Sequence, residues 1–245
     1  GGVNAGIEAT QSPIVALLNN DTEVDAGWVE HLVAALDAHP EAGFAASKML
    51  LFDRRGVLHT AGDTYSRDGL PGNRGVWQED HGQFDASTEV FSACGGGCAY
   101  RRTMLEEIGL LDEDLIAYCE DIDLAWRAQL AGYKCVFAPQ SRVYHMLSAS
   151  GGGTFASYYC GRNFIGVVAK VWPASLLRRH WWRILLRQLG FTLHSLRHLR
   201  EPSARARLRG QWAGLRLWRR MWAKRPQVFS LQRVSDGYID SILSR

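Results

Sequence analysis

The sequence lacks several features that define large classes of proteins. None of its apolar runs approaches the ~18 consecutive residues of a membrane-spanning helix, so we expect no such span. No charged segment followed by an apolar run opens the chain, and we expect no signal peptide. Internal repeats and low-complexity segments are also absent. The hydrophobic content of 47% and the charged content of 22% are those of an ordinary globular protein.

The cysteines lack the paired spacing that usually holds zinc. The five are scattered through the chain, at Cys94, Cys98, Cys119, Cys135 and Cys160. In a chain of 245 residues this predicts reduced thiols and a cytoplasmic protein. Cys94 and Cys98 could ligate a metal, but a single C-x3-C without a second pair is a weak signal.

Acidic residues are nearly absent from one region. Residues 172–225 contain fourteen arginines and lysines and one acid, Glu201, whereas the rest of the chain contains fourteen basic and 24 acidic residues. The net charge of +3 hides this asymmetry, which predicts different partners for the two regions. Because no RNA- or DNA-binding motif accompanies the basic region, we expect no nucleic acid partner.

The first 145 residues alternate short apolar runs with amphipathic segments, a pattern that predicts an α/β domain. Residues 14–18, IVALL, are the first clear strand. We expect Asp25 to cap a helix that ends at His39-Pro40, because apolar residues recur there at helical spacing. The residues in that pattern are Val29, Leu32, Val33 and Leu36. Residues 43–52 supply the next extended segment.

Further along, residues 53–90 show little periodicity and predict irregular structure or short hairpins. Thr103 and Glu106 predict a capping box for a short helix that Gly109 stops. A longer helix is expected over 121–131, closed by Gly132, and a strand over 135–139.

The opening of the chain is unusual for an α/β domain. Residues 1–13 predict a loop and a helix that lead into the 14–18 strand, with no strand before it. Because a strand–helix–strand unit takes roughly 30 residues or more, we expect the domain to be incomplete at its N-terminal side.

Oxygen-bearing side chains follow the first strand directly. Asn19, Asp21 and Glu23 come after Leu18, and ligands of open α/β sheets bind beyond the carboxyl ends of the strands. Hard cations such as Mg2+ and Mn2+ prefer oxygen ligands, so this cluster is a candidate metal site. The alternative is a simple turn, in which Asn and Asp are common.

Three carboxylates crowd the start of the helix in YCEDIDLAWRAQLAGYK (118–134): Glu120, Asp121 and Asp123. Acids are favoured there by the helix macrodipole alone, and Asp123 has Arg127 four residues on for an ion pair. Alternatively, Asp121 is a general base. The dipole lowers the pKa of such a group and neighbouring carboxylates raise it, and the sequence leaves open which effect is larger.

Two further segments are candidates for a site. His145 lies in RVYHMLSAS (142–150), ahead of the loop 148–153. A lone histidine is more often structural, but beside Asp21 it would form a pair that suits Mn2+ better than Mg2+. Gly95 and Gly96, in VFSACGGGCAYRR, would allow the backbone to approach a ligand closely or would simply give a flexible loop.

Taken in order, these segments resemble the family 2 glycosyltransferases, inverting enzymes of the GT-A fold, and most of all their bacterial rhamnosyltransferase-like branch. The resemblance covers about residues 1–170. Its matching segments are NAGI (4–7), LLNNDTEVDAGWVEHL (17–32), FSACGGGCAYRRTMLEEIGLLDE (91–113), YCEDIDLAWRAQLAGYKCVFAP (118–139), VYH (143–145) and RN (162–163).

The resemblance implies a role for each candidate. Asp21 and His145 would bind a divalent cation, Mg2+ or Mn2+, and Asp121 would be the catalytic base. Asn19 and Arg162 would contact the nucleotide-diphosphate sugar donor, while Gly95, Gly96 and Glu120 would lie on the acceptor side. The implied reaction is a single displacement that moves the sugar to a hydroxyl of a saccharide or lipid-linked acceptor of the cell surface. The alternative is a non-catalytic membrane-docking or scaffolding remnant of such an enzyme.

The region 171–245 predicts amphipathic helices rich in arginine and tryptophan. One helical face carries large apolar residues, namely Leu177, Trp181, Ile184, Leu185, Leu189, Leu193 and Leu196. Arginines flank this face at Arg178, Arg179, Arg183 and Arg187, and the tryptophans of the region are Trp172, Trp181, Trp182, Trp212, Trp218 and Trp222. Such helices suit an anionic membrane surface, and we expect residues 172–225 to hold the protein at the inner face of the cell membrane. The alternative is that they pack on the α/β domain; the oligomeric state is left open.

Overall fold

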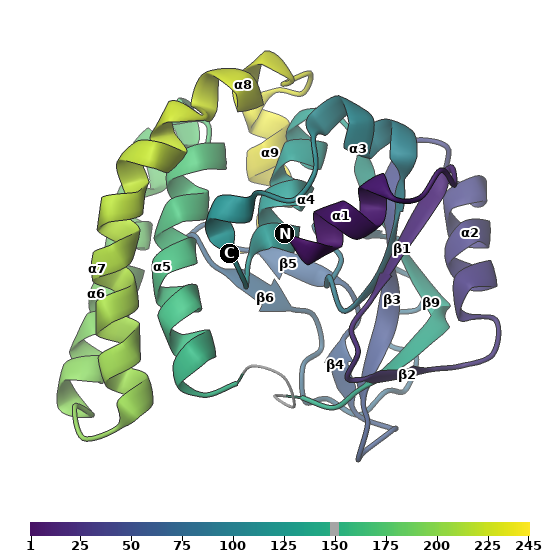
Figure 1. Ribbon diagram of the computed structural model, residues 1–245, viewed down its shortest axis with the longest axis horizontal. Helices are drawn as coiled ribbons and strands as arrows, with labels where there is room; N and C mark the ends of the chain where they lie inside the picture. Colours follow the sequence, from purple (N-terminus) through teal and green to yellow (C-terminus); the bar gives the residue numbers. More distant parts are fainter. Residues whose placement is uncertain (148–151) are drawn as a thin grey trace.

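A computed structural model of the chain describes residues 1–147 and 152–245 (Figure 1). Most of the predicted loop 148–153 therefore lies outside the described residues. The elements are, in chain order, α1 (Gly2–Glu8), β1 (Ile14–Leu18), β2 (Thr22–Val24), α2 (Trp28–Ala38), β3 (Ala42–Leu51), β4 (Leu58–Thr60), β5 (Asp63–Tyr65), β6 (Pro71–Asn73), β7 (Glu89–Val90), β8 (Gly97–Arg101), α3 (Arg102–Ile108), η1 (Glu113–Leu115), α4 (Glu120–Leu130), β9 (Lys134–His145), α5 (Thr154–Val171), α6 (Ala174–Arg197), α7 (Pro202–Ala223), α8 (Arg225–Ser230) and α9 (Asp236–Ile242).

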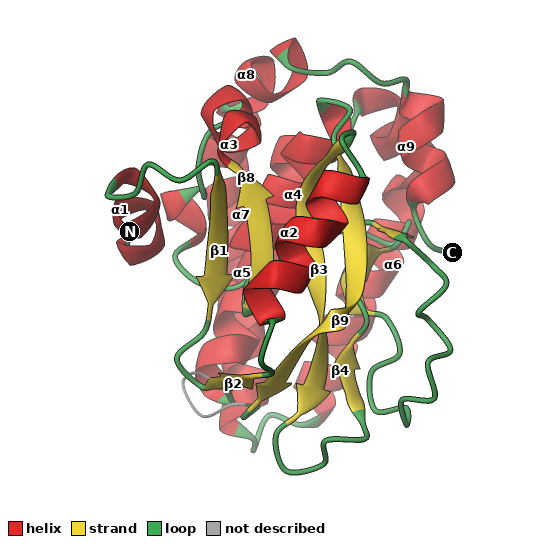
Figure 2. Cartoon of the chain, turned by 90° about the vertical axis from the view of Figure 1, so that its right-hand side faces the viewer, coloured by secondary structure: helices red, strands yellow, loops and turns green. Residues whose placement is uncertain are grey.

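A mixed sheet forms the centre of the molecule, which confirms the predicted α/β class. Among the described residues it has seven strands in the order β1-β8-β3-β9-β2, with β4 added to β3 and β7 to β9. β8 is antiparallel to both β1 and β3, and β9 is parallel to β3. β1, β3 and β9 therefore run in the same direction, and their carboxyl ends meet at the lower edge of the sheet in Figure 2.

Helices cover both faces of this sheet. α2 lies on one face, and α4, α5 and α7 lie on the other (Figure 2). The apolar period of α2 buries Leu32 and Leu36 against the sheet residues Ala45 and Met49. The core of the opposite face is larger and has an aromatic centre, formed by Tyr65, Phe91, Trp126 and Trp172.

Two predicted helix caps are wrong, although both helices exist. α2 begins at Trp28 after Gly27, whose φ of +81° suits glycine, while Asp25 lies outside the helix and accepts a hydrogen bond from the Tyr144 hydroxyl at 3.3 Å. α3 follows strand β8 without a loop, so Arg101 stands at the cap position and Thr103 lies inside the helix. α3 thus continues directly from its strand, whereas a turn at residues 25–27 separates α2 from β2.

Residues 53–90 form short strands and turns, as predicted. Ion pairs with a buried lysine hold them to the sheet. Lys48 of β3 is buried and its ammonium contacts Asp80 at 3.0 Å and Asp85 at 2.6 Å. β5 and β6 form a separate hairpin. These ion pairs fix the segment over one end of the sheet.

The C-terminal helices pack against the α/β layers (Figure 1). α5 and α7 approach so closely that a Cβ atom on Gly210 would lie 2.1 Å from the carbonyl oxygen of Tyr158. The last residues also reach the domain, where Arg67 forms a 3.0 Å ion pair with Asp240. Within the described ranges no helix combines the length and the hydropathy needed to cross a bilayer. The division into 1–170 and 171–245 stays a prediction.

The apolar face predicted for the C-terminal region 171–245, called the tail from here on, is divided between the core and the surface. Leu177 and Ile184 pack against the main core, because α6 lies over the turn at Gly69. Trp172 is fully buried and cannot reach a surface. The other predicted residues of the face are exposed: Trp181, Leu185, Leu189, Leu193 and Leu196.

Candidate active site

Asp21 and His145 meet at the carboxyl edge of the sheet. β1 ends at Leu18, and the chain turns into β2, which pairs antiparallel with β9 so that Thr22 stands opposite His145. The amide of Met146 donates to the carbonyl of Asp21 at 2.9 Å and holds this register. As a result Asp21 Oδ1 lies 3.3 Å from His145 Nε2, and both side chains are largely buried.

A second histidine, which no sequence pattern indicated, adjoins this pair. His59 of β4 places its Nδ1 at 3.1 Å from Nδ1 of His145. Burial, and then the charge of His145, lower the pKa of His59 to about 4. β4 and β9 both pair with β3. This pairing brings His59 to His145. The sequence alone gives no sign of it, because His59 stands alone in an irregular stretch.

The glycine segment 95–97 contacts both Asn19, which follows β1, and Asp121, at the start of α4. The amide of Asn19 donates to the carbonyl of Gly96 at 3.2 Å, while the amide of Gly95 donates to Asp121 Oδ2 at 3.0 Å. A Cβ atom on Gly96 would lie 3.2 Å from the side-chain nitrogen Nδ2 of Asn19, tighter than ordinary contact. Asn19 and Asp121, 102 positions apart in the sequence, thus contact adjacent residues of one loop.

Asp121 stands in the first turn of α4, where its carboxylate is held from both sides. Besides the Gly95 contact, Oδ1 accepts the amide of Ile122 at 2.8 Å. Burial raises the pKa of Asp121, and the amides of Gly95 and Ile122 oppose this shift. Burial and then the charge of Asp121 raise the pKa of Glu120 to about 7. Glu120 also lines a pocket of about 270 Å³ between α1 and residues 111–116.

Asp63 is a second carboxyl group beside Asp121 that the sequence did not indicate. Ligand atoms of Asp63, Cys94 and Asp121 all lie within 4.8 Å of one another. Burial raises the pKa of Asp63 to about 7, the Thr60 hydroxyl opposes this, and the Asp121 charge adds to it. Cys94 therefore belongs with these two carboxyl groups, while Cys98 is buried in β8 opposite Leu17.

The backbone ahead of α4 has an uncommon conformation. Ile116, Tyr118 and Cys119 have φ values of 67°, 64° and 68°, which non-glycine residues rarely adopt. The side-chain amide of buried Asn163 donates to three carbonyls of this segment, those of Leu115, Ala117 and Tyr118, at 2.7–2.9 Å. Asn163 thus stabilises the backbone segment that leads to Asp121.

Arg162, the neighbour of Asn163, serves the same segment. Its guanidinium donates to the carbonyl of Asp114 at 2.8 Å and to Oδ1 of Asn163 at 2.7 Å. These contacts occupy N–H groups that a phosphate would use. The expected contact of Arg162 with the nucleotide-sugar substrate stays a prediction.

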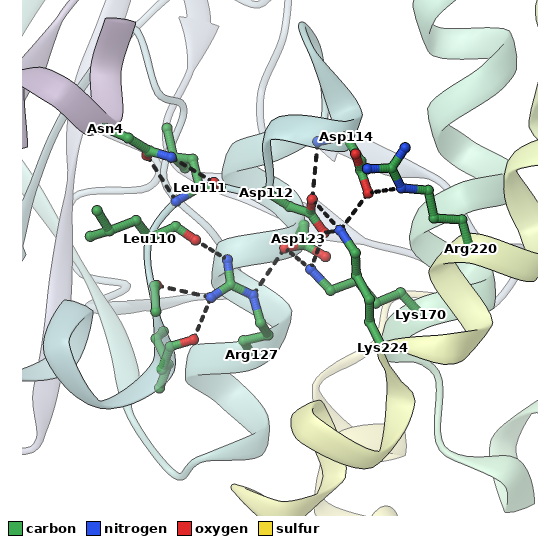
Figure 3. Close-up of polar contacts among 12 residues, drawn as sticks. Asn4, Leu110, Leu111, Asp112, Asp114, Asp123, Arg127, Lys170, Arg220 and Lys224 are labelled. Atoms are coloured by element: carbon green, nitrogen blue, oxygen red, sulfur yellow. Dashed lines mark hydrogen bonds and ion pairs between the residues drawn. The ribbon is translucent and has the colours of Figure 1, made fainter. Parts of the chain in front are cut away.

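A buried ion network continues from α4 to the C-terminal helices (Figure 3). Asp123 and Arg127 form the predicted i,i+4 pair at 2.9 Å, and Lys170 of α5 contacts both Asp123 and Asp112 at 2.7 Å. Lys224, just after α7, contacts Asp112 at 2.6 Å, and Arg220 contacts Asp114. The guanidinium of Arg127 also donates to the carbonyls of residues 108–110. The network ties α4, the 108–115 segment and the tail into one unit.

The fold is that of a GT-A glycosyltransferase. Its mixed sheet carries Asp21 and His145 at the carboxyl edge, and the adjacent helix α4 carries Asp121 in its first turn. A crystal structure of GalNAc-T7 with UDP, GalNAc and Mn2+ shares this fold, with a TM-score of 0.54, 21% identity and coverage of 70% of this chain and 34% of that chain. The model of the glycosyl transferase family group 2 matches residues 14–206, and the chain belongs to this family.

Several bacterial proteins are similar to the chain over part of their length. The uncharacterized protein y4gI of Sinorhizobium fredii is 31% identical over 61% of this chain and 17% of its own length. The O-antigen biosynthesis protein RfbC of Myxococcus xanthus is 29% identical over 60% of this chain and 12% of its own. An N-acetylglucosaminyl-diphospho-decaprenol L-rhamnosyltransferase of Mycobacterium tuberculosis is 28% identical over 71% of this chain and 58% of its own. The chain thus spans less than two thirds of each relative.

Proposed function

We propose that the chain contributes the catalytic part of an inverting glycosyltransferase. It would move a sugar from a nucleotide-diphosphate donor to a hydroxyl acceptor in the synthesis of a cell-surface polysaccharide or glycolipid. Family membership supports the reaction class, and the names of the O-antigen and rhamnosyltransferase relatives support the pathway class. The observation that carries the proposal is the contact of Asn19 and Asp121 with neighbouring residues of one glycine loop.

Asp21 and His145 are the proposed holders of a divalent cation, Mg2+ or Mn2+. Two ligands at a right angle about one ion, each bonded at roughly 2.1 Å, lie about 3 Å apart. The 3.3 Å between Asp21 Oδ1 and His145 Nε2 fits that requirement. A carboxylate with an imidazole favours Mn2+, the cation in the GalNAc-T7 structure. When bound, the cation would neutralise charge that develops on the leaving diphosphate.

Asp121 is the proposed general base. In a single displacement, the acceptor oxygen forms a bond to the anomeric carbon while the bond from that carbon to the diphosphate breaks. The acceptor proton passes to the Asp121 carboxylate, whose oxygens each keep a lone pair beyond their amide contacts. Burial raises the pKa of Asp121, which strengthens it as a base, and the two amides hold its direction.

The other proposed roles follow from the family resemblance. Asn19 and Arg162 would face the donor, and Gly95, Gly96 and Glu120 would face the acceptor. Gly96 supports this arrangement because a side chain there would press on Asn19.

Substitution of Asp121 in the full-length protein tests the catalytic proposal. Asp121→Asn keeps the size but removes the base and leaves a single oxygen to accept from the amides of Gly95 and Ile122, so kcat for sugar transfer should fall by about 100- to 10,000-fold. Asp37→Asn, an exposed change on α2 across the sheet, is the matched control and should leave kcat unchanged. Transfer at the normal rate by the folded Asp121→Asn protein would remove Asp121 as the base.

The tail is proposed to hold the protein on an anionic membrane at its cytoplasmic face. Large apolar side chains of α6, each at least 45% exposed, form a continuous face: Trp181, Trp182, Leu185, Leu186, Leu189, Leu193 and Leu196. Arg178 and Arg197 are exposed on the same helix. Exposed apolar area of this extent beside arginine suits the headgroup zone.

Flotation with vesicles that contain anionic lipid tests the membrane proposal. Trp181→Ser combined with Leu185→Ser should move most of the protein from the vesicle fraction to the soluble fraction. Val29→Ser, a similarly exposed change on α2, should have no effect. If the intact protein stays soluble at low salt, the proposal fails. If it floats but catalyses no sugar transfer, the non-catalytic docking alternative gains support.

A further inference from the structure

His59 and His145 must share one proton between their facing nitrogens. Their Nδ1 atoms lie 3.1 Å apart, a hydrogen-bond distance, and the ring centroids are 4.9 Å apart. Two nitrogens at this distance require one donor and one acceptor. A neutral imidazole carries its single hydrogen on one nitrogen, so this contact couples the tautomers of the two rings.

The tautomer of His145 decides what its other nitrogen can do. Nε2 of His145 faces Asp21 Oδ1 at 3.3 Å. A nitrogen that binds a cation needs a free lone pair, which leaves the hydrogen of His145 on Nδ1. That hydrogen points at His59, whose Nδ1 must then accept it.

We propose that His59 is a positioning residue for the cation site, holding His145 in the tautomer that turns the Nε2 lone pair toward Asp21. The inference rests on the proposed function, because it takes Asp21 and His145 as the cation holders. For the metal-free pair we take the opposite tautomers, with the hydrogen of His145 on Nε2, which faces Asp21 at 3.3 Å, and the hydrogen of His59 on Nδ1. Cation binding therefore exchanges the nitrogen that carries the hydrogen on each ring, with no proton gained or lost.

Two substitutions at His59 separate its hydrogen-bonding role from its bulk. His59→Phe keeps a ring but removes the acceptor, whereas His59→Asn offers a side-chain oxygen near the position of Nδ1. The affinity for Mn2+ alone, measured by electron paramagnetic resonance on the full-length protein, should fall about 10- to 100-fold in His59→Phe. It should recover to within about threefold of the unaltered protein in His59→Asn. Circular dichroism checks that both variants are folded.

His145→Ala distinguishes failure of this inference from failure of the cation site. If His145→Ala weakens Mn2+ binding and His59→Phe does not, the cation site stands and the role of His59 is overturned. If neither variant changes the affinity, or the intact protein binds no Mn2+, the proposed cation site itself fails, and the inference with it. In the metal-free protein, a 15N–15N coupling across the hydrogen bond between the two Nδ1 atoms is expected, and its absence would also count against the pair.

Discussion

Lys170 of α5 contacts Asp123 of α4 at 2.7 Å, and neither side chain is open to water, with 6% and 0% exposed. The same ammonium contacts Asp112 at 2.7 Å. The helix whose first turn contains the proposed base is therefore bound by ion pairs to the first helix of the C-terminal group. Buried charges of this kind are costly to leave without a partner.

Lys170→Met should destabilise the protein strongly. The change keeps most of the side-chain volume but leaves the negative charges of Asp123 and Asp112 with fewer partners. We expect a loss of about 3–5 kcal/mol in the free energy of unfolding, measured by urea denaturation. Arg179→Ala is the control: its partner is Asp240, but the arginine side chain is 64% exposed, and the loss should stay below about 1 kcal/mol. Equal losses in the two variants would contradict the assigned importance of burial.

Gly210→Ala should separate α5 from α7. The added Cβ atom would lie 2.1 Å from the backbone oxygen of Tyr158, which cannot rotate away. We expect a net loss of about 1–3 kcal/mol, even though alanine favours a helix. Gly190→Ala on α6 meets nothing within 4 Å and should instead stabilise by up to about 1 kcal/mol. Thermal unfolding of both variants measures the difference, and a stabilised Gly210→Ala protein would refute the close approach.

Asp63→Asn should change how stability depends on pH. The folded state raises the pKa of Asp63 to about 7 from its usual 3.8, so it binds more protons than the unfolded state between these values. Stability from this group therefore falls as the pH rises through that window and is constant above it. Asparagine keeps the acceptor for Thr60 and has no charge to bury.

Unfolding at two pH values measures this effect. The stability of Asp63→Asn relative to the unaltered protein should increase by on the order of 2 kcal/mol between pH 5.5 and pH 8.5. Glu23→Gln, at an exposed position, is the control and should show no comparable change. A constant difference at both pH values would show that Asp63 is ionised throughout.

Asn163→Ala should loosen the backbone that leads to Asp121. It removes the donor to the carbonyls of Leu115, Ala117 and Tyr118, in a segment with unfavourable φ values. We expect faster amide hydrogen exchange over residues 116–122 and a loss of about 1–3 kcal/mol. Arg162→Ala removes the contacts with the Asp114 carbonyl and Oδ1 of Asn163 but leaves the three donations of Asn163 in place, so it should affect exchange less. If the two variants behave alike, Asn163 has no special place in holding this segment.

Local patterns predicted much of the fold. The apolar runs of β1 and β3, the α2 and α4 periods and the glycines after α3 and α4 all mark elements that the structure contains. Predictions for Asp25 and Thr103 were wrong because α2 begins only after Gly27 and α3 begins directly after β8. Strand β9 was predicted over five residues and extends over twelve, since pairing with β3 continues past a register shift beyond Ser47.

The sequence likewise indicated some residues of the candidate site and not others. Asp21, Asp121 and His145 could be selected because their residue types, at the end of a strand or the start of a helix, have chemical meaning by themselves. His59, Asp63 and Asn163 gave no such signal: their partners lie 86, 58 and up to 48 positions away in the sequence. Contacts over such separations depend on strand order and helix packing, which no local pattern records.

The sequence by itself determined the α/β class, the family resemblance and the charge division between the two parts of the chain, because these depend on residue type and short spacing. Only the tertiary structure decided which apolar residues of α6 are exposed, that the pKa of Asp121 is raised, and which histidine adjoins His145. Solvent exclusion and hydrogen-bond geometry are properties of the packed chain, and they arise only when distant segments come together.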